Sequence, residues 1–319
     1  MEAFDGERLE MTEEKFRQYW RKATEKTSSS ISKVHFGHYK AAAKSKKLAK
    51  FLAQKVTVTV RTGCPPERWS NGLQVLLEKI AGIFLVEKLR AILLMEADFN
   101  HFNKWAFGYE ALNALAEDGY IPEEFYAQRE STAEDAKMDN RLTTDLSRQL
   151  RHPMAQTSAD AANCYDRINH IIMSLLLLAV TGCLGWVVSM LHPIQTMKFF
   201  QRTAWGDSST YFGGPDRSRV LQGLCQGNGA APACWAMLCA VIMRCYFHQG
   251  FGAVITSPIA GHIIRCLGTN FVDDTDLFVW LPELCNAEEV WQEMQASVDE
   301  WGMLLAATGG SLKPEKCYW

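Results

Sequence analysis

The stretch Phe271-Val272-Asp273-Asp274-Thr275-Asp276 places two adjacent carboxylates at a point where the chain is expected to reverse direction. Strand-forming and apolar residues lie on both sides, at 266–270 before the stretch and at 277–280 after it. Gly and Asn residues in the lead-in are typical of a strand that ends in a turn. The sequence therefore predicts a β-hairpin with Asp273 and Asp274 at its tip.

Two neighbouring carboxylates repel each other, and each raises the pKa of the other unless a cation neutralises them. Their hard oxygen atoms suit Mg²⁺ or Mn²⁺. A pair of aspartates between apolar segments is also typical of a solvated turn. Other parts of the sequence are needed to distinguish a metal site from a solvated turn.

A further carboxylate lies upstream, where Asp160 stands between a short extended segment and a long apolar stretch. Two metal ions need a bridging ligand from a second element of the fold. Asp160 would complete a site that holds two divalent ions about 4 Å apart, as in phosphoryl transfer. Asp166 stands beside Arg167, and a role at a helix start or in an ion pair is predicted for it instead.

Three blocks of the sequence resemble the palm motifs of reverse transcriptases. Asp160, with Tyr165 five residues later and then Asp-Arg-Ile, resembles the first palm motif. Residues 271–274 resemble the second carboxylate motif. Between them, residues 223–232 resemble the glutamine-glycine block, with Ala231 where a serine is usual. The order, spacing and content of the three blocks agree.

Flanking blocks extend the resemblance to roughly residues 30–319. Residues 66–69, 76–79 and 88–92 resemble the fingers of the enzymes from retrotransposons and group II introns. Residues 126–136 resemble a further fingers block, although they lack its usual Gly-Phe-Arg sequence. Residues 309–316 resemble the lysine-bearing motif that closes the palm.

The resemblance implies an α+β fold, the fingers and palm of a right-hand polymerase, with an antiparallel palm sheet backed by helices. Residues 1–30 would form a polar N-terminal helix and linker, residues 31–150 the fingers, and residues 151–319 the palm with the catalytic carboxylates. A thumb is expected to be absent, and processive synthesis by this chain is expected to be weak. Helices are predicted over residues 99–117, 133–150 and 287–307.

The implied activity is RNA-directed DNA synthesis, in which a primer 3′-hydroxyl attacks the α-phosphate of a deoxynucleoside triphosphate. Asp160 and Asp273 would hold two Mg²⁺ or Mn²⁺ ions, Asp274 would support them, and the backbone carbonyl of Ala161 would join one of them. Lys316 would protonate the leaving pyrophosphate. The implied partners are an RNA or DNA template with its primer.

Nucleotide contacts also follow from the resemblance. Arg90 and Arg129 would meet the triphosphate, for which a planar guanidinium is well suited. Gln226 and Gly227 would line the nucleotide and template side. Tyr165 would lie beneath the sugar and exclude ribonucleotides by overlap.

Composition sets broader limits. The chain has 319 residues, 48% of them hydrophobic, and can bury a large core. Its net charge of −3 is unusual for a nucleic-acid binder, but residues 26–66 hold nine Lys or Arg and no acidic residue. Lys40, Lys44 and Lys47 stand at helical spacing, which indicates either a basic helix against nucleic acid or a solvated face.

The ten cysteines show no paired metal-type spacing, and no secretory signal opens the chain, so an intracellular, reducing location is expected. The apolar stretches 171–191 and 230–247 are interpreted as core helices and not as membrane spans, the first because Thr181-Gly182 breaks it.

Two alternatives remain open at this point. An RNA-dependent RNA polymerase also combines a spaced aspartate block with a two-aspartate hairpin, although Tyr165 disfavours an open ribose pocket. The other alternative is an inactive retroelement fragment that only binds nucleic acid or a partner.

Overall fold

The computed structural model describes residues 9–26, 30–128, 131–215, 222–256, 259, 261–281 and 285–319. The chain divides into two compact units, each built from two stretches of sequence. Unit 1 comprises Met1–Ala114 and His170–Ala233, and unit 2 comprises Leu115–Asn169 and Cys234–Trp319. Within these described residues, the fold is α+β with one mixed sheet and two antiparallel sheets, which agrees with the predicted α+β class.

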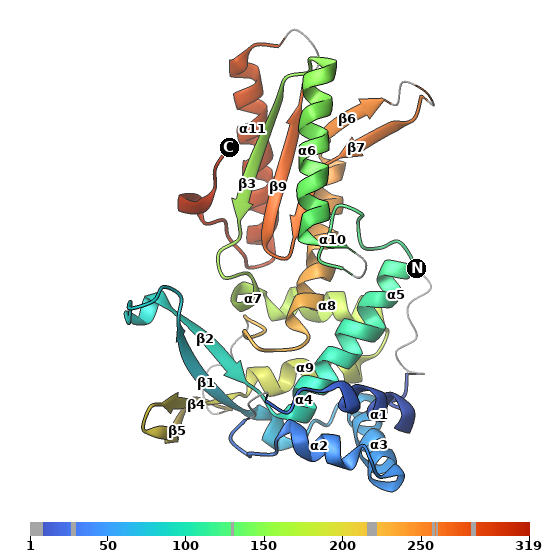
Figure 1. The fold of residues 1–319 in the computed structure, drawn as a ribbon, viewed down its shortest axis with the longest axis vertical. Coiled ribbons are helices and arrows are strands. Elements are labelled where there is room, and N and C mark those ends of the chain that lie inside the picture. The colour runs from blue at the N-terminus through green and yellow to red at the C-terminus, as the bar shows by residue number, and fades with distance from the viewer. Residues whose placement is uncertain are drawn as a thin grey trace. The chain divides into compact units, whose positions relative to one another are not determined.

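Unit 1 combines helices with a mixed sheet (Figure 1). Its helical elements are α1 Glu13–Lys22, α2 Phe36–Ala42, α3 Lys46–Thr62, η1 Glu67–Ser70, η2 Val86–Lys88, α4 Ala97–Asn103, the π-helix η3 Lys104–Ala111, α8 His170–Thr181 and α9 Leu184–Gln195. Its strands are β1 Asn71–Glu78, β2 Leu89–Leu94, β4 Lys198–Thr203 and β5 Gly206–Gly213. Helix α5, Leu112–Glu117, crosses the division between the units.

The mixed sheet has the order β2-β1-β4-β5, in which β1 and β4 run parallel and the other pairs are antiparallel. Unit 1 also contains a cluster of aromatic rings around Trp69 of η1. Trp69 stacks on Phe99 with 5.0 Å between ring centroids and on Phe102 with 5.6 Å. The Trp69 indole also donates to Asp98 Oδ1 at 3.0 Å, so its buried N–H has a partner.

The single basic helix expected through Lys40, Lys44 and Lys47 is wrong. Helix α2 ends at Ala42, and α3 starts after Ser45, whose side chain accepts a hydrogen bond from the Leu48 amide. A serine N-cap begins a new helix because it satisfies an otherwise unpaired amide. Lys40 instead donates to the Ala23 carbonyl at 3.1 Å, while Lys44 and Lys47 are exposed.

Unit 2 holds the remaining elements. They are α6 Ala133–Leu150, β3 Met154–Asp160, α7 Cys164–Arg167, most of α10 Ala231–His248, β6 Ala253–Thr256, β7 Ile263–Cys266, β8 Gly268–Phe271, β9 Asp274–Trp280, α11 Ala287–Ala307 and η4 Pro314–Lys316.

The centre of unit 2 is an antiparallel sheet of order β3-β9-β8, flanked in Figure 1 by α6 and α11. Leu277 lines a small cavity together with Trp301 of α11 and Tyr246 of α10. On the opposite face, Asn140 of α6 donates to Asp276 Oδ2 at 2.6 Å. Because successive strand residues alternate between faces, the apolar side of β9 is covered and its acidic side is left for polar contacts.

Several predicted elements are confirmed. Helices α6 and α11 have the predicted bounds, and the hairpin of β8 and β9 places Asp273 in its turn. The apolar stretch 171–191 is broken as predicted, since α8 ends at Thr181 and α9 begins at Leu184.

By length and composition, Ala231–His248 is the one described helix that could cross a membrane. It is 67% buried within the protein. The side chain of Tyr246 on this helix shares a 2.5 Å hydrogen bond with Ser297 of α11 and packs edge-on against Trp301. This burial agrees with the predicted core helix.

The two compact units do not follow the boundary expected near residue 150. Each unit contains residues from both sides of that point in the sequence. The assignment of fingers and palm subdomains stays a prediction, and the expected linker residues 28 and 29 lie outside the described residues.

Candidate functional site

The register of the unit 2 sheet brings two of the predicted carboxylates opposite each other. Asp160 is the last residue of β3, Asp274 is the first residue of β9, and the two are partners in the antiparallel ladder. The Cβ atoms of such partners lie about 5 Å apart. Two elements that are distant in sequence therefore present their carboxylates on the same face and at the same end of the sheet.

The turn that carries Asp273 has a strained backbone. Val272 precedes it with φ of 62°, in the left-handed region that branched residues rarely adopt. Such a conformation costs on the order of 1–3 kcal/mol and persists only where its surroundings enforce it. Trp235 of α10 supplies one such constraint, because its indole N–H donates to the Val272 carbonyl.

A cation from the chain already faces the carboxylates. The Lys316 Nζ lies 2.8 Å from Asp160 Oδ2, and the Asp160 side chain is only 17% exposed. The closing segment is fixed to β3 by backbone pairing, since the Lys313 amide donates to the Asp160 carbonyl at 2.9 Å. The Asp160 carboxylate, through its hydrogen bond and its charge, raises the pKa of Lys316.

Electrostatic repulsion is concentrated at Asp274. Its pKa is raised, chiefly by burial and then by the charges of Asp273, Asp160 and Asp276, while Lys316 opposes the shift. The site therefore carries more negative charge than Lys316 neutralises. Such a group favours the arrival of further cations.

Tyr165 lies close to this group. It belongs to the short helix α7, which follows Asn163 in the left-handed conformation, and its side chain is partly buried. Burial raises the pKa of the Tyr165 hydroxyl, and the charges of Cys164 and Asp273 raise it further. The charge of a predicted metal ligand therefore acts on the predicted sugar-contacting residue, and both belong to unit 2.

An open pocket of about 610 Å³ adjoins the carboxylates. Asp274 and Asp276 line it from β9, Ser158 from β3, Phe271 from β8 and Tyr318 from the closing segment. The space beside Asp274 thus has an acidic wall and an aromatic wall.

The donor atoms at this site suit a divalent metal ion, since carboxylate and carbonyl oxygens are the ligands that Mg²⁺ and Mn²⁺ prefer. The Lys316 ammonium already supplies one positive charge beside the Asp160 carboxylate. As the side chains stand, no three His, Cys, Asp or Glu residues in the described ranges are grouped closely enough to hold a metal ion. The chemistry of the donors fits the predicted ions, and the side chains would have to converge to bind them.

Three of the other predicted nucleotide-binding residues, Arg90, Gln226 and Gly227, belong to unit 1. Arg90 is exposed on β2, and Gln226 and Gly227 form the turn before α10. Arg129 lies outside the described residues. Arg90, Gln226 and Gly227 therefore do not share a compact unit with the carboxylates.

The glutamine-glycine turn is packed tightly against β2. The Leu93 amide donates to the Gln226 carbonyl at 2.8 Å. Gly227 has φ of +108°, and a Cβ added there would lie 2.3 Å from the Leu93 carbonyl oxygen. No residue with a side chain fits this position without moving the strand, which gives a packing reason for the glycine of the block.

Three asparagines that the sequence analysis did not single out hold this turn. Asn100 Nδ2 donates to the Gly227 carbonyl at 3.1 Å, and the Gly229 amide donates to Asn100 Oδ1 at 2.6 Å. The buried Asn228 side chain donates to the Leu224 carbonyl and accepts from Asn103 Nδ2, both at 2.9 Å. Of the three, Asn228 lies within the glutamine-glycine block, residues 223–232. That position was the signal in the sequence that could have identified it.

Comparison with known proteins gives a limited result. No protein-family model matches the chain, and no curated protein matches it either. Among solved structures, apo telomerase from Candida tropicalis truncated from its C-terminal domain shows 14% identity and a TM-score of 0.49 over 86% of this chain and 55% of that chain.

Two further telomerase structures give similar values. Apo telomerase from Candida tropicalis has 14% identity and a TM-score of 0.49 over 79% of this chain and 44% of that one. Telomerase from Candida albicans in complex with a TWJ fragment of telomeric RNA has 12% identity and a TM-score of 0.48 over 86% and 46%. The chain spans about half the length of these chains. Similarity at this level does not assign the chain to a family.

Proposed function

We propose that this chain carries the nucleotidyl-transfer centre of a reverse transcriptase of the retroelement type. The observation that carries the proposal is the pairing of Asp160 with Asp274 across the sheet, with Lys316 on Asp160. The residues come from sequence blocks in the order that the motif resemblance requires. The proposed partners are an RNA or DNA template with a primer, and deoxynucleoside triphosphates.

Asp160, Asp273, Asp274 and the Ala161 carbonyl would hold two Mg²⁺ or Mn²⁺ ions. When bound, these ions would neutralise charge on the reacting phosphates. The side chains of Asp160 and Asp274 could converge, because they are ladder partners. The Cβ atoms of such partners lie about 5 Å apart, which allows the carboxylate oxygens to approach each other. The chain's own contribution is to fix the ligands on a rigid hairpin, with Trp235 restraining the turn.

Lys316 is the proposed proton donor to the leaving pyrophosphate. Its raised pKa keeps the ammonium protonated while Asp160 is charged and adjacent. If the negative charge around Lys316 decreased, the pKa of Lys316 would fall and its proton would be easier to transfer. The side chain is 59% exposed, so it can reach a group outside the sheet.

The proposal is tested by primer extension with an oligo-dT primer on a poly-rA template, first in Mg²⁺ and then in Mn²⁺. Asp273→Asn should lower the rate at least about a hundredfold, as for the loss of a catalytic electrostatic group. Asp299→Asn is the matched control, because it removes the same charge from an exposed position on α11. Extension by Asp273→Asn at more than a tenth of the parent rate would remove the carboxylates from the mechanism.

A second candidate is a non-catalytic chain that only binds nucleic acid. It is favoured by the finding that no metal-holding group is assembled among the described side chains. A folded parent chain that binds template and primer but extends nothing in either metal would select it. Incorporation of ribonucleotides in preference to deoxyribonucleotides would select the RNA polymerase alternative instead.

A further inference from the structure

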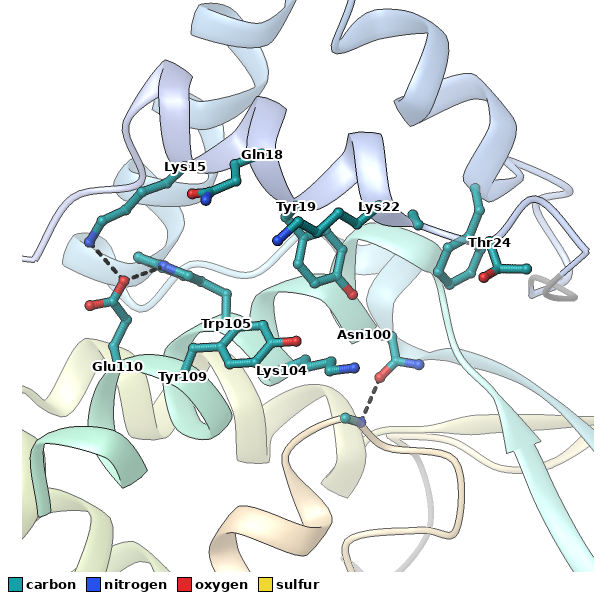
Figure 2. Close-up of a pocket in the computed structure, with 13 residues that line it drawn as sticks. Lys15, Gln18, Tyr19, Lys22, Thr24, Asn100, Lys104, Trp105, Tyr109 and Glu110 are labelled. Atoms are coloured by element: carbon teal, nitrogen blue, oxygen red, sulfur yellow. Dashed lines mark hydrogen bonds and ion pairs between the residues drawn. The ribbon is translucent and has the colours of Figure 1, made fainter. Parts of the chain in front are cut away.

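Unit 1 contains an open pocket of about 660 Å³ between helix α1 and the π-helix η3 (Figure 2). Lys15, Tyr19 and Lys22 line it from α1, and Lys104, Tyr109 and Glu110 line it from η3. All of these residues belong to unit 1, whereas the carboxylates belong to unit 2. The motif resemblance gave none of them a role.

The π-helix explains how the η3 side chains reach the pocket. In this segment the Leu112 amide bonds to the Phe107 carbonyl, five residues back, so residues five apart lie on one side. Trp105 Nε1 accordingly donates to Glu110 Oε1 at 2.8 Å. The Lys104 ammonium lies 5.7 Å from the centroid of the Tyr109 ring. Segments of π-helix are rare and are often found at functional sites.

The lining has a net positive charge in a chain whose net charge is −3. Lys15 is neutralised by Glu110, with 2.7 Å between Nζ and Oε1. Lys22 and Lys104 are exposed, and neither has a carboxylate at ion-pair distance within the part of the chain that the structure describes. Two uncompensated ammonium groups at one pocket suit an anion with more than one charge.

The same pocket offers aromatic surface. The Tyr19 ring lies 4.0 Å from the buried His101 ring and edge-on to Tyr109, with 6.5 Å between the two tyrosine centroids. Tyr109 remains 46% exposed. An exposed ring that is fixed beside a second ring provides a face on which a planar group can stack.

We propose that this pocket binds a nucleotide, with its base stacked on Tyr109 and its phosphate held by Lys22 and Lys104. A nucleotide joins a planar aromatic group to an anion, and those are the two features that the lining complements. The nucleotide could be free or part of a single strand, and the experiment separates these two sources. The inference does not depend on the carboxylates of unit 2.

The pocket has a direct structural link to the glutamine-glycine turn. Asn100 is one of its lining residues, and its side chain bonds to Gly229 (Figure 2) and also to Gly227. Gly229 itself also lines the pocket. A bound nucleotide would therefore contact the same side chain that holds the turn.

The test measures binding of a fluorescently labelled single-stranded oligonucleotide by anisotropy in EDTA, which prevents catalysis. The double variant Lys22→Ala/Lys104→Ala should weaken binding and reduce the slope of log K against log salt by about 0.7, because the two lysines hold one phosphate. Lys50→Ala/Lys55→Ala removes the same charge from exposed positions of α3 and should leave the slope unchanged. Equal losses in both double variants would overturn the proposal.

The aromatic part is tested separately. Tyr109→Ala should weaken binding about tenfold or more, the loss expected for one stacked base, while Tyr109→Phe should keep the parent affinity. The salt slope should not change in either variant. An abasic strand that binds as tightly as the normal strand would overturn the stacking assignment, as would an unchanged affinity in Tyr109→Ala.

Competition identifies the source of the ligand. Displacement by a free nucleoside monophosphate, lost in the pocket variants, would support a free nucleotide. Displacement only by a second unlabelled strand would support a strand segment. Displacement by an acidic peptide of equal charge, with no dependence on Tyr109, would overturn the proposal in favour of a protein partner.

The outcome is distinguishable from failure of the proposed function. Asp273→Asn should bind the strand like the parent while failing to extend a primer. Loss of pocket binding with normal primer extension would reject the pocket alone. Intact pocket binding with no extension by the folded parent chain would reject only the nucleotidyl-transfer proposal.

Discussion

At the scale of single residues, Asp274 carries an electrostatic cost in the folded chain. Its folded pKa lies above the ordinary value of 3.8 because burial and the neighbouring carboxylates disfavour its charge. The folded state therefore binds more protons than the unfolded state in that pH range, and stability falls as pH rises through the raised pKa. The cost is present at neutral pH and vanishes in acid.

Asp274→Asn should consequently raise the free energy of unfolding at pH 7, by about 0.5 kcal/mol because solvent screens so exposed a group. The gain should diminish as the pH falls through the raised pKa to below 3.8. Urea denaturation at several pH values measures it, with Asp299→Asn as the control. A gain that is the same at every pH would show that charge is not its cause.

Metal ions should instead stabilise the parent chain more than Asp274→Asn. If Mg²⁺ binds the folded carboxylates, addition of MgCl₂ should raise the melting temperature of the parent chain more than that of Asp274→Asn. Differential scanning fluorimetry with and without MgCl₂, at constant ionic strength, measures the effect. Equal shifts in both chains would argue against a role for Asp274 in metal binding.

Tyr165 gives a prediction about substrate choice. A ring against the C2′ position of the incoming sugar would leave no room for a hydroxyl group. In an active chain, Tyr165→Val should raise ribonucleotide use relative to deoxyribonucleotide use at least about tenfold, which corresponds to about 1.4 kcal/mol. Tyr165→Phe keeps the ring and should keep the ratio of the two kcat/KM values. A ratio unchanged in Tyr165→Val would return this residue to an ordinary packing role.

The motif resemblance named Asp160, Asp274 and Lys316, and the strand ladder and an ion pair bring these three residues together. It did not predict that Trp235 would bond to the Val272 carbonyl or that Asn140 would bond to Asp276. These contacts join positions 37 and 136 residues apart. Nothing local in the sequence specifies them.

At the scale of elements, helices α3 and α9 approach each other closely at a glycine. A Cβ added to Gly185 would lie 1.9 Å from the Val60 carbonyl oxygen. The Ser189 hydroxyl donates to the Thr59 carbonyl at 3.0 Å in the same contact. The two helices are thus held at a separation that only glycine permits.

Gly185→Ala should destabilise the chain by about 1–3 kcal/mol, the usual cost of overpacking. Gly108→Ala is the matched control, because its nearest neighbour would be 3.9 Å away and alanine favours helix over glycine by up to about 1 kcal/mol. Chemical denaturation of both variants measures the difference. Equal stability of the two would mean that α9 moves away from α3 without cost.

Element bounds were predictable where capping residues mark them. Thr132 with Asp135 forms the capping box of α6, and Asn286 with Glu289 forms that of α11. The prediction failed at Ser45, where helical spacing of lysines outweighed an equally visible N-cap. The π-helix could not be predicted, because its pattern of apolar residues does not differ from that of an ordinary helix over so short a segment.

At the scale of the whole molecule, the chain crosses between its two units three times, after Ala114, Asn169 and Ala233. The motif resemblance implied one boundary near residue 150, between the expected fingers and the expected palm. Interleaving of segments depends on contacts between distant residues, and no single composition shift reveals it. The sheet order β2-β1-β4-β5 illustrates this, since β4 pairs with β1 across more than a hundred residues.

Fragments 1–150 and 151–319 should therefore each fail to fold cooperatively. Each would contain parts of both units and all of neither, and the sheet of unit 2 would lose α6. Thermal melts followed by circular dichroism should show no sharp transition for either fragment, and co-expression should restore one. A sharp transition in an isolated fragment would show that the cut respects a folding boundary after all.

The closing segment that carries Lys316 also covers an edge of the unit 2 sheet. It borders β3 through the two backbone hydrogen bonds between Ser158 and Tyr318, and on the other side of the sheet β8 is bordered by residues 124–126 at Asn270. Exposed strand edges invite pairing with another chain. If the segment separated from β3, the strand edge would be exposed to pairing with another chain, and the Lys316 ammonium would move away from Asp160. Solubility and charge balance at this site would therefore be lost together.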